Sequence, residues 1–136
     1  MTIEKAMSST VVTIDADDTL LHATRMMKDS KIKHLPVVDR SGGLVGIVTD
    51  RDLKKASASD ATTLEVHELL YLLDKVKIQS IMSKHVVTVD KGTPLKQAAL
   101  LMVDKGIGCL PVMDGTQLVG IVTRTDVLRY FANLND

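Results

Sequence analysis

Residues 44–52 read LVGIVTDRD, and residues 118–126 read LVGIVTRTD. The two stretches lie 74 residues apart, and a longer similarity upstream of them, beginning with Met7 and Met82, recurs at a spacing of 75 residues. A repeat of this length is a whole folding unit rather than one turn of a solenoid. Two such units in a small chain are expected to pack about a pseudo-twofold axis and to form two equivalent clefts between them.

The composition indicates a mixed α/β protein. Hydrophobic residues make up 45% of the 136 residues, with two tyrosines and one phenylalanine as the only aromatic residues, so the core must be aliphatic. Seventeen basic and seventeen acidic residues balance, which removes any general attraction to nucleic acid or anionic membranes. A single cysteine excludes an internal disulfide, and no N-terminal apolar run resembles a signal or spanning segment. We therefore expect a cytoplasmic protein with no nucleic-acid partner and no membrane insertion.

Each copy predicts the order strand, helix, strand, strand, helix. β-Branched residues place the first strands at residues 10–14 and 86–89. Apolar residues recurring every three or four positions place a helix after each strand. These stripes consist of Leu20, Ala23, Thr24 and Met27 in the first copy and Leu95, Ala98, Ala99 and Met102 in the second. We predict Asp18 as the N-cap of the first helix and Thr93 as that of the second, with Pro94 at its first position.

A β-hairpin and a final helix are predicted to complete each copy. Continuous apolar runs separated by short polar turns are typical of paired strands. These strands are expected at residues 35–38 and 44–49 in the first copy and at residues 110–113 and 118–123 in the second. The final helices are expected to begin near Asp50 and Arg124.

The segment between the copies has no counterpart after the second one. Residues 57–61 have the composition of a linker, and Thr62 with Glu65 has the spacing of a capping box. A helix is expected over residues 64–76, with leucines that cover either the body of the protein or a second protomer. The predicted division is a first repeat at residues 1–56, a linker and connector helix at 57–77, and a second repeat at 78–136.

The recurring motif is Gly, two aliphatic residues, Thr, two variable residues and Asp. It places Thr49 and Thr123 at the end of a strand and Asp52 and Asp126 in the first turn of the following helix. A helix start favours an anion, and a carboxylate accepts hydrogen bonds from a diol, so the pattern suits phosphate and ribose. Thr and Asp at a helix start are also common caps, and the motif alone leaves both interpretations open.

The chain resembles the tandem cystathionine-β-synthase (CBS) domain pair, or Bateman module. The resemblance spans nearly the whole chain and rests on the Met-Ser…Val-Val-Thr opening at residues 7–13, Leu-Pro-Val-Val-Asp at 35–39 and Gly-Ile-Val-Thr-Asp-Arg-Asp at 46–52. The connector VHELLYLL at 66–73, followed by Ile-Met-Ser at 81–83, further resembles the CBS part of AcuB-type acetoin-utilisation proteins. This family implies an α/β (α+β) fold of two β-α-β-β-α repeats about a pseudo-twofold axis.

The resemblance implies a non-catalytic regulatory module that binds AMP, ADP, ATP or S-adenosylmethionine and transmits its ligand state to an enzyme or transporter. By matched position, Asp52 and Asp126 would hold ribose hydroxyls, while Thr49 and Thr123 would contact ribose or phosphate. Ile47 and Ile121 would pack on the base. The adenine edge would be read by backbone groups of Lys33, His34, Gly108 and Cys109, and the clefts would be bordered by Thr10, Thr13, His85 and Thr88. The alternative is a ligand-free platform for protein interaction or dimerisation.

The two copies differ in basic residues, so we expect unequal sites. Arg51 of the first copy lies where it would meet a phosphate, whereas the second copy has Arg124 one position earlier. Lys31 and Lys33 also have glycines as their counterparts, which concentrates positive charge in the first copy. The alternative for Arg51 is a surface ion pair with one of the neighbouring aspartates, Asp50 or Asp52.

Catalytic and metal sites are not expected. No nucleophile–base constellation or Walker-type phosphate loop is recognisable, and the four histidines lack metal-ligand spacing. Cys109 is interpreted as a small apolar core residue. Apolar residues outside the main stripes of the first helices favour a homodimer, because a monomer would leave part of them exposed. These residues are Leu21, Met26, Leu100, Leu101 and Val103.

Overall fold

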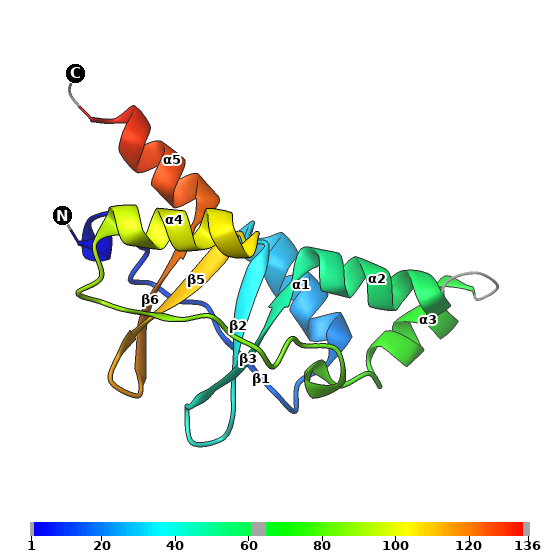
Figure 1. Ribbon diagram of the computed structural model, residues 1–136. Helices are drawn as coiled ribbons and strands as arrows, with labels where there is room; N and C mark the ends of the chain where they lie inside the picture. The colour runs from blue at the N-terminus through cyan, green and yellow to red at the C-terminus, as the bar shows by residue number, and fades with distance from the viewer. Residues whose placement is uncertain (1, 61–64, 135–136) are drawn as a thin grey trace. The chain divides into compact units, whose positions relative to one another are not determined.

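The computed structural model describes residues 2–60 and 65–134 (Figure 1). Within them the chain forms two three-stranded sheets, each accompanied by helices, which confirms the predicted mixed α and β class. The backbone divides into two compact units. We call Val12–Val86 the repeat-1 unit, and Met1–Val11 together with Val87–Asp136 the repeat-2 unit.

The repeat-1 unit contains one sheet of order β1-β2-β3. Its elements are β1 (Ile14–Asp15), α1 (Leu20–Ser30), β2 (His34–Val38), β3 (Leu44–Thr49), α2 (Asp50–Asp60), α3 (Val66–Leu73) and the 3-10 helix η2 (Ile78–Ser80). β1 runs parallel to β2, and β2 and β3 form the predicted antiparallel hairpin. Leu35, Val37 and Val48 of the sheet are fully buried and share a core with Leu20 and Ala23 of α1.

The repeat-2 unit repeats this arrangement with a sheet of order β4-β5-β6. Its elements are the 3-10 helix η1 (Ile3–Lys5), β4 (Val89–Asp90), α4 (Leu95–Lys105), β5 (Cys109–Asp114), β6 (Gln117–Thr123) and α5 (Arg124–Ala132). The core contains Leu110, Val112 and Val122 of the sheet, Ala98 of α4 and Ile3 from the N-terminal segment. The final helices begin at Asp50 and Arg124, as predicted.

The first strand of each repeat is shorter than predicted. Only Ile14–Asp15 and Val89–Asp90 pair as strands, instead of residues 10–14 and 86–89. The reason is that each β-branched run crosses from one unit to the other, with the division falling after Val11 and after Val86. Only the last residues of each run pair regularly, Ile14–Asp15 with β2 and Val89–Asp90 with β5.

Two short segments complete the unit of the opposite repeat. Residues 2–8, the N-terminal arm, lie on the repeat-2 unit, where Ser8 and Ile121 exchange two backbone hydrogen bonds of 2.9 and 3.0 Å. Residues 77–83, the connector arm, lie on the repeat-1 unit, where Ser83 and Ile47 exchange two of 2.9 and 3.0 Å. Each sheet edge is thus bridged by the segment that precedes the other repeat in the sequence.

The helix caps differ from the prediction by one residue. Thr19, not Asp18, caps α1, and its Oγ1 accepts a hydrogen bond from the His22 N–H at 3.2 Å. Asp18 supports this turn by accepting from the Thr19 N–H at 2.8 Å. In the second copy Pro94 occupies the N-cap position of α4 with extended backbone, and the helix begins at Leu95.

The predicted linker is partly wrong. α2 continues to Asp60, and the Ser57 hydroxyl donates to the Leu53 carbonyl at 2.8 Å, so residues 57–60 are helical. Ala61 and Thr62 lie outside the described residues, and Glu65 is the N-cap of α3 without a side-chain hydrogen bond. α3 is shorter than the predicted helix over residues 64–76.

Some apolar residues expected to need a partner are covered within their own units. Leu21 and Met26 pack against the repeat-1 core, and Leu101 packs against the repeat-2 core. Leu100 and Val103 of α4 remain exposed, at 53% and 76% of their surface. Among the described helices, none has both the length and the apolar character needed to cross a membrane.

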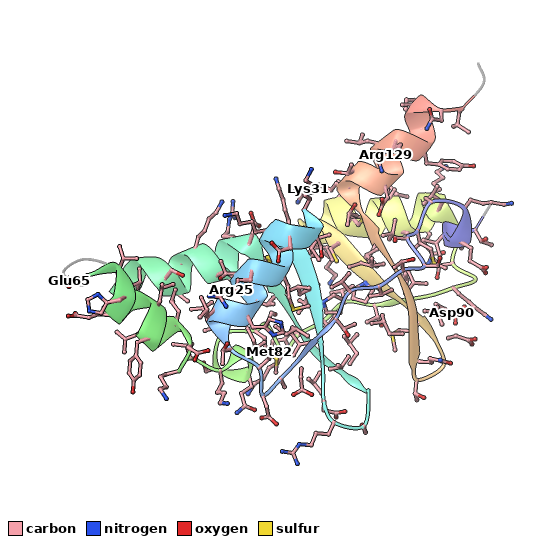
Figure 2. All side chains as sticks on the ribbon, turned by 180° about the vertical axis from the view of Figure 1, so that it is seen from behind. Arg25, Lys31, Glu65, Met82, Asp90 and Arg129 are labelled. Atoms are coloured by element: carbon pink, nitrogen blue, oxygen red, sulfur yellow. The ribbon has the colours of Figure 1, made fainter. Side chains whose placement is uncertain are left out.

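α1 and α4 end in the same left-handed turn with different residues. Lys31 has φ 55° and Gly106 has φ 64°. In each copy the residue that follows donates its backbone N–H to the carbonyl of the last buried methionine of the helix, at 3.0 Å. Figure 2 shows Lys31 at the end of α1. A side chain is strained in this conformation, whereas glycine is not.

We expect Lys31→Gly to raise the free energy of unfolding by about 0.5–1 kcal/mol, because it removes that strain. The matched change Gly106→Ala should lower it by a similar amount, and a Cβ at Gly106 would meet no atom within 4 Å, so only backbone conformation is tested. Urea denaturation measures both. Equal stability of Lys31→Gly and the wild type would contradict this explanation.

Candidate functional site

The recurring Thr-x-x-Asp motif forms a reciprocal cap at the start of α2 and of α5. The Thr49 N–H donates to Asp52 Oδ2 at 2.9 Å, and the Asp52 N–H donates to Thr49 Oγ1 at 3.2 Å. The Thr123 and Asp126 pair repeats this at 2.8 and 3.2 Å. Each pair therefore satisfies two helix-start donors, and the cap interpretation of the motif is correct.

Capping leaves part of each carboxylate available. Only Oδ2 of Asp52 and of Asp126 accepts a hydrogen bond, and Oδ1 has no partner among residues 2–60 and 65–134. Both aspartates are half-buried, so their Oδ1 atoms keep some access to solvent or ligand. A carboxylate oxygen held in this way accepts hydrogen bonds from a diol without losing the cap.

The hairpin register brings the predicted base-edge residues to these caps. His34 lies opposite Thr49 in the sheet, and Cys109 lies opposite Thr123. The Lys33 carbonyl accepts the Asp50 N–H at 3.0 Å. The Gly108 carbonyl accepts the Arg124 N–H at 3.1 Å in the same way. These four residues are thus assembled around the helix starts, although two of their carbonyls already have a partner.

The other candidate residues divide between the units. Ile47 and Ile121 are half-buried and lie two residues before each capping threonine. Thr13 and His85 belong to the repeat-1 unit with Asp52, and Thr10 and Thr88 belong to the repeat-2 unit with Asp126. Thr13 is half-buried, whereas the other three are exposed. No hydrogen bond joins these four side chains to the capping boxes in the described part of the chain.

Arg51 does not form the surface ion pair that was its alternative role. Asp50 pairs with Lys54 instead, with 3.7 Å between Oδ2 and Nζ, and Asp52 accepts from the Thr49 N–H. Arg51 is exposed and has no ion pair with any described residue. Among the described residues its guanidinium is therefore exposed and not held by a direct ion pair.

The arms are the part of this region that the sequence reasoning missed. Met7 packs against Gly120 and Met82 packs against Gly46, one residue before the isoleucine bridged by each arm. The available signal was the joint recurrence of Met-Ser and of the motif glycine in both copies. Sequence similarity alone pairs each Met-Ser with its own repeat, and only the structure shows the exchange.

Cys109 is a core residue, in agreement with its interpretation from the sequence. It is 6% exposed, and burial raises the pKa of its thiol to about 12, with a further contribution from the charge of Asp126. The neutral thiol is the form that this environment favours.

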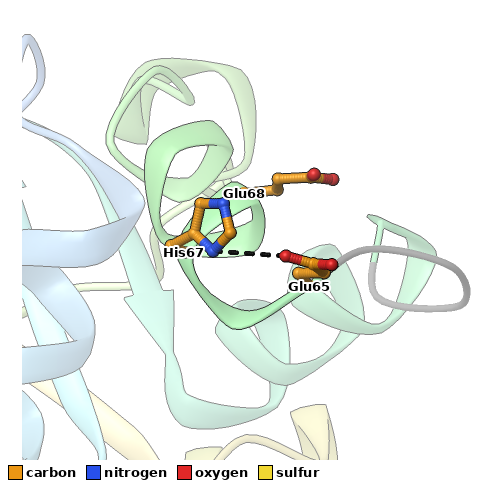
Figure 3. A group of neighbouring side chains, drawn as sticks. All are labelled: Glu65, His67 and Glu68. Carbon is orange, nitrogen blue, oxygen red and sulfur yellow. Dashed lines mark ion pairs between the residues drawn. The ribbon is translucent and has the colours of Figure 1, made fainter.

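Glu65, His67 and Glu68 at the start of α3 form the one group of potential metal ligands in the described residues (Figure 3). His67 Nδ1 lies 3.5 Å from Glu65 Oε2, and the ligand atoms of all three lie within 4.8 Å of one another. All three side chains are exposed. The positive end of the helix dipole opposes a cation here, and exposed acidic groups commonly gather without a metal, so we assign no metal site.

We expect the contribution of Cys109 to stability to fall at alkaline pH. Because its pKa is raised on folding, the contribution is complete below the unfolded value of about 8.5 and is lost as the pH rises from there toward 12. The loss is at most about 1.4 kcal/mol per pH unit. Urea unfolding at pH 7 and pH 10 should show a narrower difference between the wild type and Cys109→Ala at pH 10; an unchanged difference would contradict the raised pKa.

Comparison with known proteins identifies the family. The chain matches the family model of the CBS domain over residues 3–59 and again over residues 78–133. A CBS domain-containing protein of Dictyostelium discoideum is 39% identical over 127 residues, which cover 93% of this chain and 88% of that protein. Two further curated relatives, both from Methanocaldococcus jannaschii, are longer, and the chain spans 32% and 47% of their lengths.

Solved structures share the fold over almost the whole chain. An acetoin utilization protein (AcuB) from Vibrio cholerae is 32% identical with a TM-score of 0.83, over 98% of this chain and 91% of that one. The CBS domain pair of protein MJ0100, in complex with 5′-methylthioadenosine and S-adenosyl-L-methionine, is 30% identical with a TM-score of 0.81, over 96% and 99%. CBSX2 in complex with AMP is 25% identical with a TM-score of 0.79, over 96% of both chains. This chain belongs to the CBS domain family and carries a tandem pair of these domains.

Proposed function

We propose that this CBS pair is a regulatory module that binds an adenosyl ligand at the capping aspartates Asp52 and Asp126. The observation that carries the proposal is the Oδ1 atom of each half-buried carboxylate, which has no hydrogen-bond partner in the described part of the chain and lies where a strand ends and a helix begins. The adenosyl ligands bound by MJ0100 and CBSX2 support the ligand class. AMP, ADP, ATP and S-adenosylmethionine are the candidates.

The roles of the individual residues in this proposal are those that the family resemblance implies. Oδ1 of the aspartate accepts from the ribose hydroxyls, and Ile47 or Ile121 packs on the base. Backbone groups beside the cap read the adenine edge. In the repeat-1 unit these are Lys33 and His34, with Thr13 and His85 as further contacts; in the repeat-2 unit they are Gly108 and Cys109, with Thr10 and Thr88.

We propose no catalytic step for these residues. The capping carboxylates are held by backbone N–H groups, and the thiol of Cys109 is buried with a raised pKa, so neither is arranged as a base or nucleophile. The proposed output is transmission of the ligand state to a regulated enzyme or transporter in the cytoplasm.

Self-association is a second part of the proposal, and an interaction platform without ligand is the alternative function. The repeat-2 unit exposes large apolar side chains on two helices: Leu100 and Val103 on α4, and Leu128 and Phe131 on α5. Val103 and Phe131 are 76% and 72% exposed. Large apolar side chains exposed on two helices of one unit favour a homodimer.

Light scattering at micromolar concentration should give twice the chain mass of 14.8 kDa. Phe131→Glu should shift this mass toward that of the monomer, because it places a charge in the apolar surface. A monomeric wild type would contradict the homodimer.

Removing either capping carboxylate should weaken adenosyl-ligand binding. We expect Asp52→Ala and Asp126→Ala each to cost about 1–3 kcal/mol of binding free energy, the scale for loss of a charged hydrogen-bond acceptor. Isothermal titration calorimetry with AMP and with S-adenosylmethionine measures the loss.

A cap without a proposed ligand contact supplies the control. Thr19→Ala removes the N-cap of α1 and should lower stability by about 1 kcal/mol with no change in ligand affinity. If the aspartate variants behave like Thr19→Ala, losing stability but binding normally, the motif serves only as a cap.

The two sites should differ in their preference for phosphate. Arg51 and Lys33 are exposed at the repeat-1 cap, whereas the equivalent positions of the repeat-2 unit are Thr125 and Gly108. Each added phosphate brings negative charge, and an exposed guanidinium stabilises that charge. Arg51→Ala should therefore weaken binding of ATP more than of AMP or adenosine, and should reduce the salt dependence of ATP binding.

Arg40→Ala makes the same change of charge in the β2–β3 turn, at the opposite end of the hairpin from Thr49. It should leave the order of ligand affinities unchanged in calorimetry. Equal losses for ATP, AMP and adenosine in Arg51→Ala would remove the support for a phosphate contact.

A further inference from the structure

Each arm packs closely against a glycine of its edge strand. A Cβ built on Gly120 would lie 2.5 Å from Met7 Sδ and 3.1 Å from the Ser8 carbonyl oxygen. A Cβ on Gly46 would lie 2.5 Å from Met82 Sδ and 2.9 Å from the Ser83 carbonyl oxygen. Contacts shorter than 3.0 Å force a neighbouring atom to move, so an alanine at either position would disturb the arm: at Gly120 mainly the Met7 side chain, and at Gly46 also the Ser83 backbone.

The residue after each glycine is the isoleucine proposed to pack on the base. Ile121 has both its backbone N–H and its carbonyl hydrogen-bonded to Ser8, and Ile47 has both bonded to Ser83. Two residues later, Thr123 and Thr49 begin the caps. An arm that fixes the isoleucine therefore fixes the strand end from which the ligand-contacting residues project.

The arms are firmly anchored upstream of these contacts. Ile3 is fully buried in the repeat-2 core, and its N–H donates to the Thr93 carbonyl at 2.8 Å. Ile78 is fully buried in the repeat-1 core, and its N–H donates to the Asp18 carbonyl at 2.9 Å. Each arm thus carries a core anchor at one end and the isoleucine bridge at the other.

We propose that the two arms are positioning elements for the two ligand sites. Met7 and Ser8 position Ile121 for the site at Asp126, and Met82 and Ser83 position Ile47 for the site at Asp52. This inference rests on the proposed adenosyl-ligand function. It adds that each ligand site depends on one arm, and that this arm precedes the other repeat in the sequence.

Docking of an arm and binding of a ligand are then linked in both directions. If a docked arm raises affinity at its site, a bound ligand stabilises the docked arm by the same free energy. A ligand at Asp126 therefore acts on the N-terminal arm. A ligand at Asp52 acts on the connector arm, which follows α3 in the chain.

The test uses calorimetry with AMP as the probe. Gly120→Ala should weaken, by about tenfold or more, the binding event that Asp126→Ala removes, because the new methyl group displaces the arm. The event that Asp52→Ala removes should be unchanged. Gly46→Ala, the matched variant, should show the opposite selectivity.

Second substitutions test the contacts directly. Met7→Ala should restore most of the affinity lost in Gly120→Ala, because the contact shorter than 3.0 Å is to its flexible side chain. Met82→Ala should restore less of the affinity lost in Gly46→Ala, since the Ser83 carbonyl oxygen remains at 2.9 Å. Met7→Ala and Met82→Ala alone provide the baselines for these double-mutant cycles.

Hydrogen exchange rates of the wild-type arm amides distinguish a positioning role from a merely structural one. Saturating AMP should slow exchange of the Ile3 and Ser8 amides if it binds at Asp126, and of the Ile78 and Ser83 amides if it binds at Asp52. Each effect should disappear in the corresponding aspartate variant. This measurement also decides the matter if Gly120→Ala fails to fold.

The outcomes separate the two proposals. AMP binding with unchanged arm exchange, or a folded Gly120→Ala that binds AMP normally at both sites, overturns the positioning role and leaves the ligand function standing. A wild type that binds neither AMP nor S-adenosylmethionine overturns both.

Discussion

The reciprocal hydrogen bonds between a threonine and an aspartate at each strand–helix junction govern the organisation of this protein. They end a buried strand, start a helix and hold one carboxylate in a fixed orientation with an unpartnered oxygen. The hairpin register then places the first residues of β2 and β5 beside that carboxylate. The same side chain can therefore act as a cap and, as proposed, accept hydrogen bonds from a ligand, so the two interpretations of the motif are compatible.

Local patterns were sufficient to predict the hairpins and the buried stripes of the first helices. Leu20, Ala23 and Met27 are buried as their spacing required, whereas Thr24 is exposed and donates to the Leu20 carbonyl. The first strands were predicted too long, because β-branched composition does not reveal that each run begins in one unit and ends in the other. The caps at Thr19 and Pro94 depended on backbone geometry, for which Asp18 and Thr93 were equally plausible in the sequence.

The candidate site was predictable to a similar degree. The repeat singled out the threonines and aspartates, and the register confirms that Lys33, His34, Gly108 and Cys109 lie next to them. Two features could not be predicted from the sequence. One is the pairing of Asp50 with Lys54 rather than with Arg51, which has no ion pair with any residue the structure describes. The other is the set of arm contacts. One of them joins Ser8 to Ile121, which lie more than a hundred positions apart in the sequence.

The exchange of arms also bears on how such a chain arises by duplication. Each compact unit consists mainly of one repeat, and the segment that precedes the other repeat in the sequence supplies its arm. A chain with a single repeat would carry one arm and one glycine-edged strand to receive it. Two copies that exchanged arms would reproduce the pairing seen here, with each Met-Ser on the partner's glycine. Fusing two such genes in tandem would convert that exchange between molecules into one within a single chain, after which the two arms are free to diverge in sequence while each remains matched to the opposite unit.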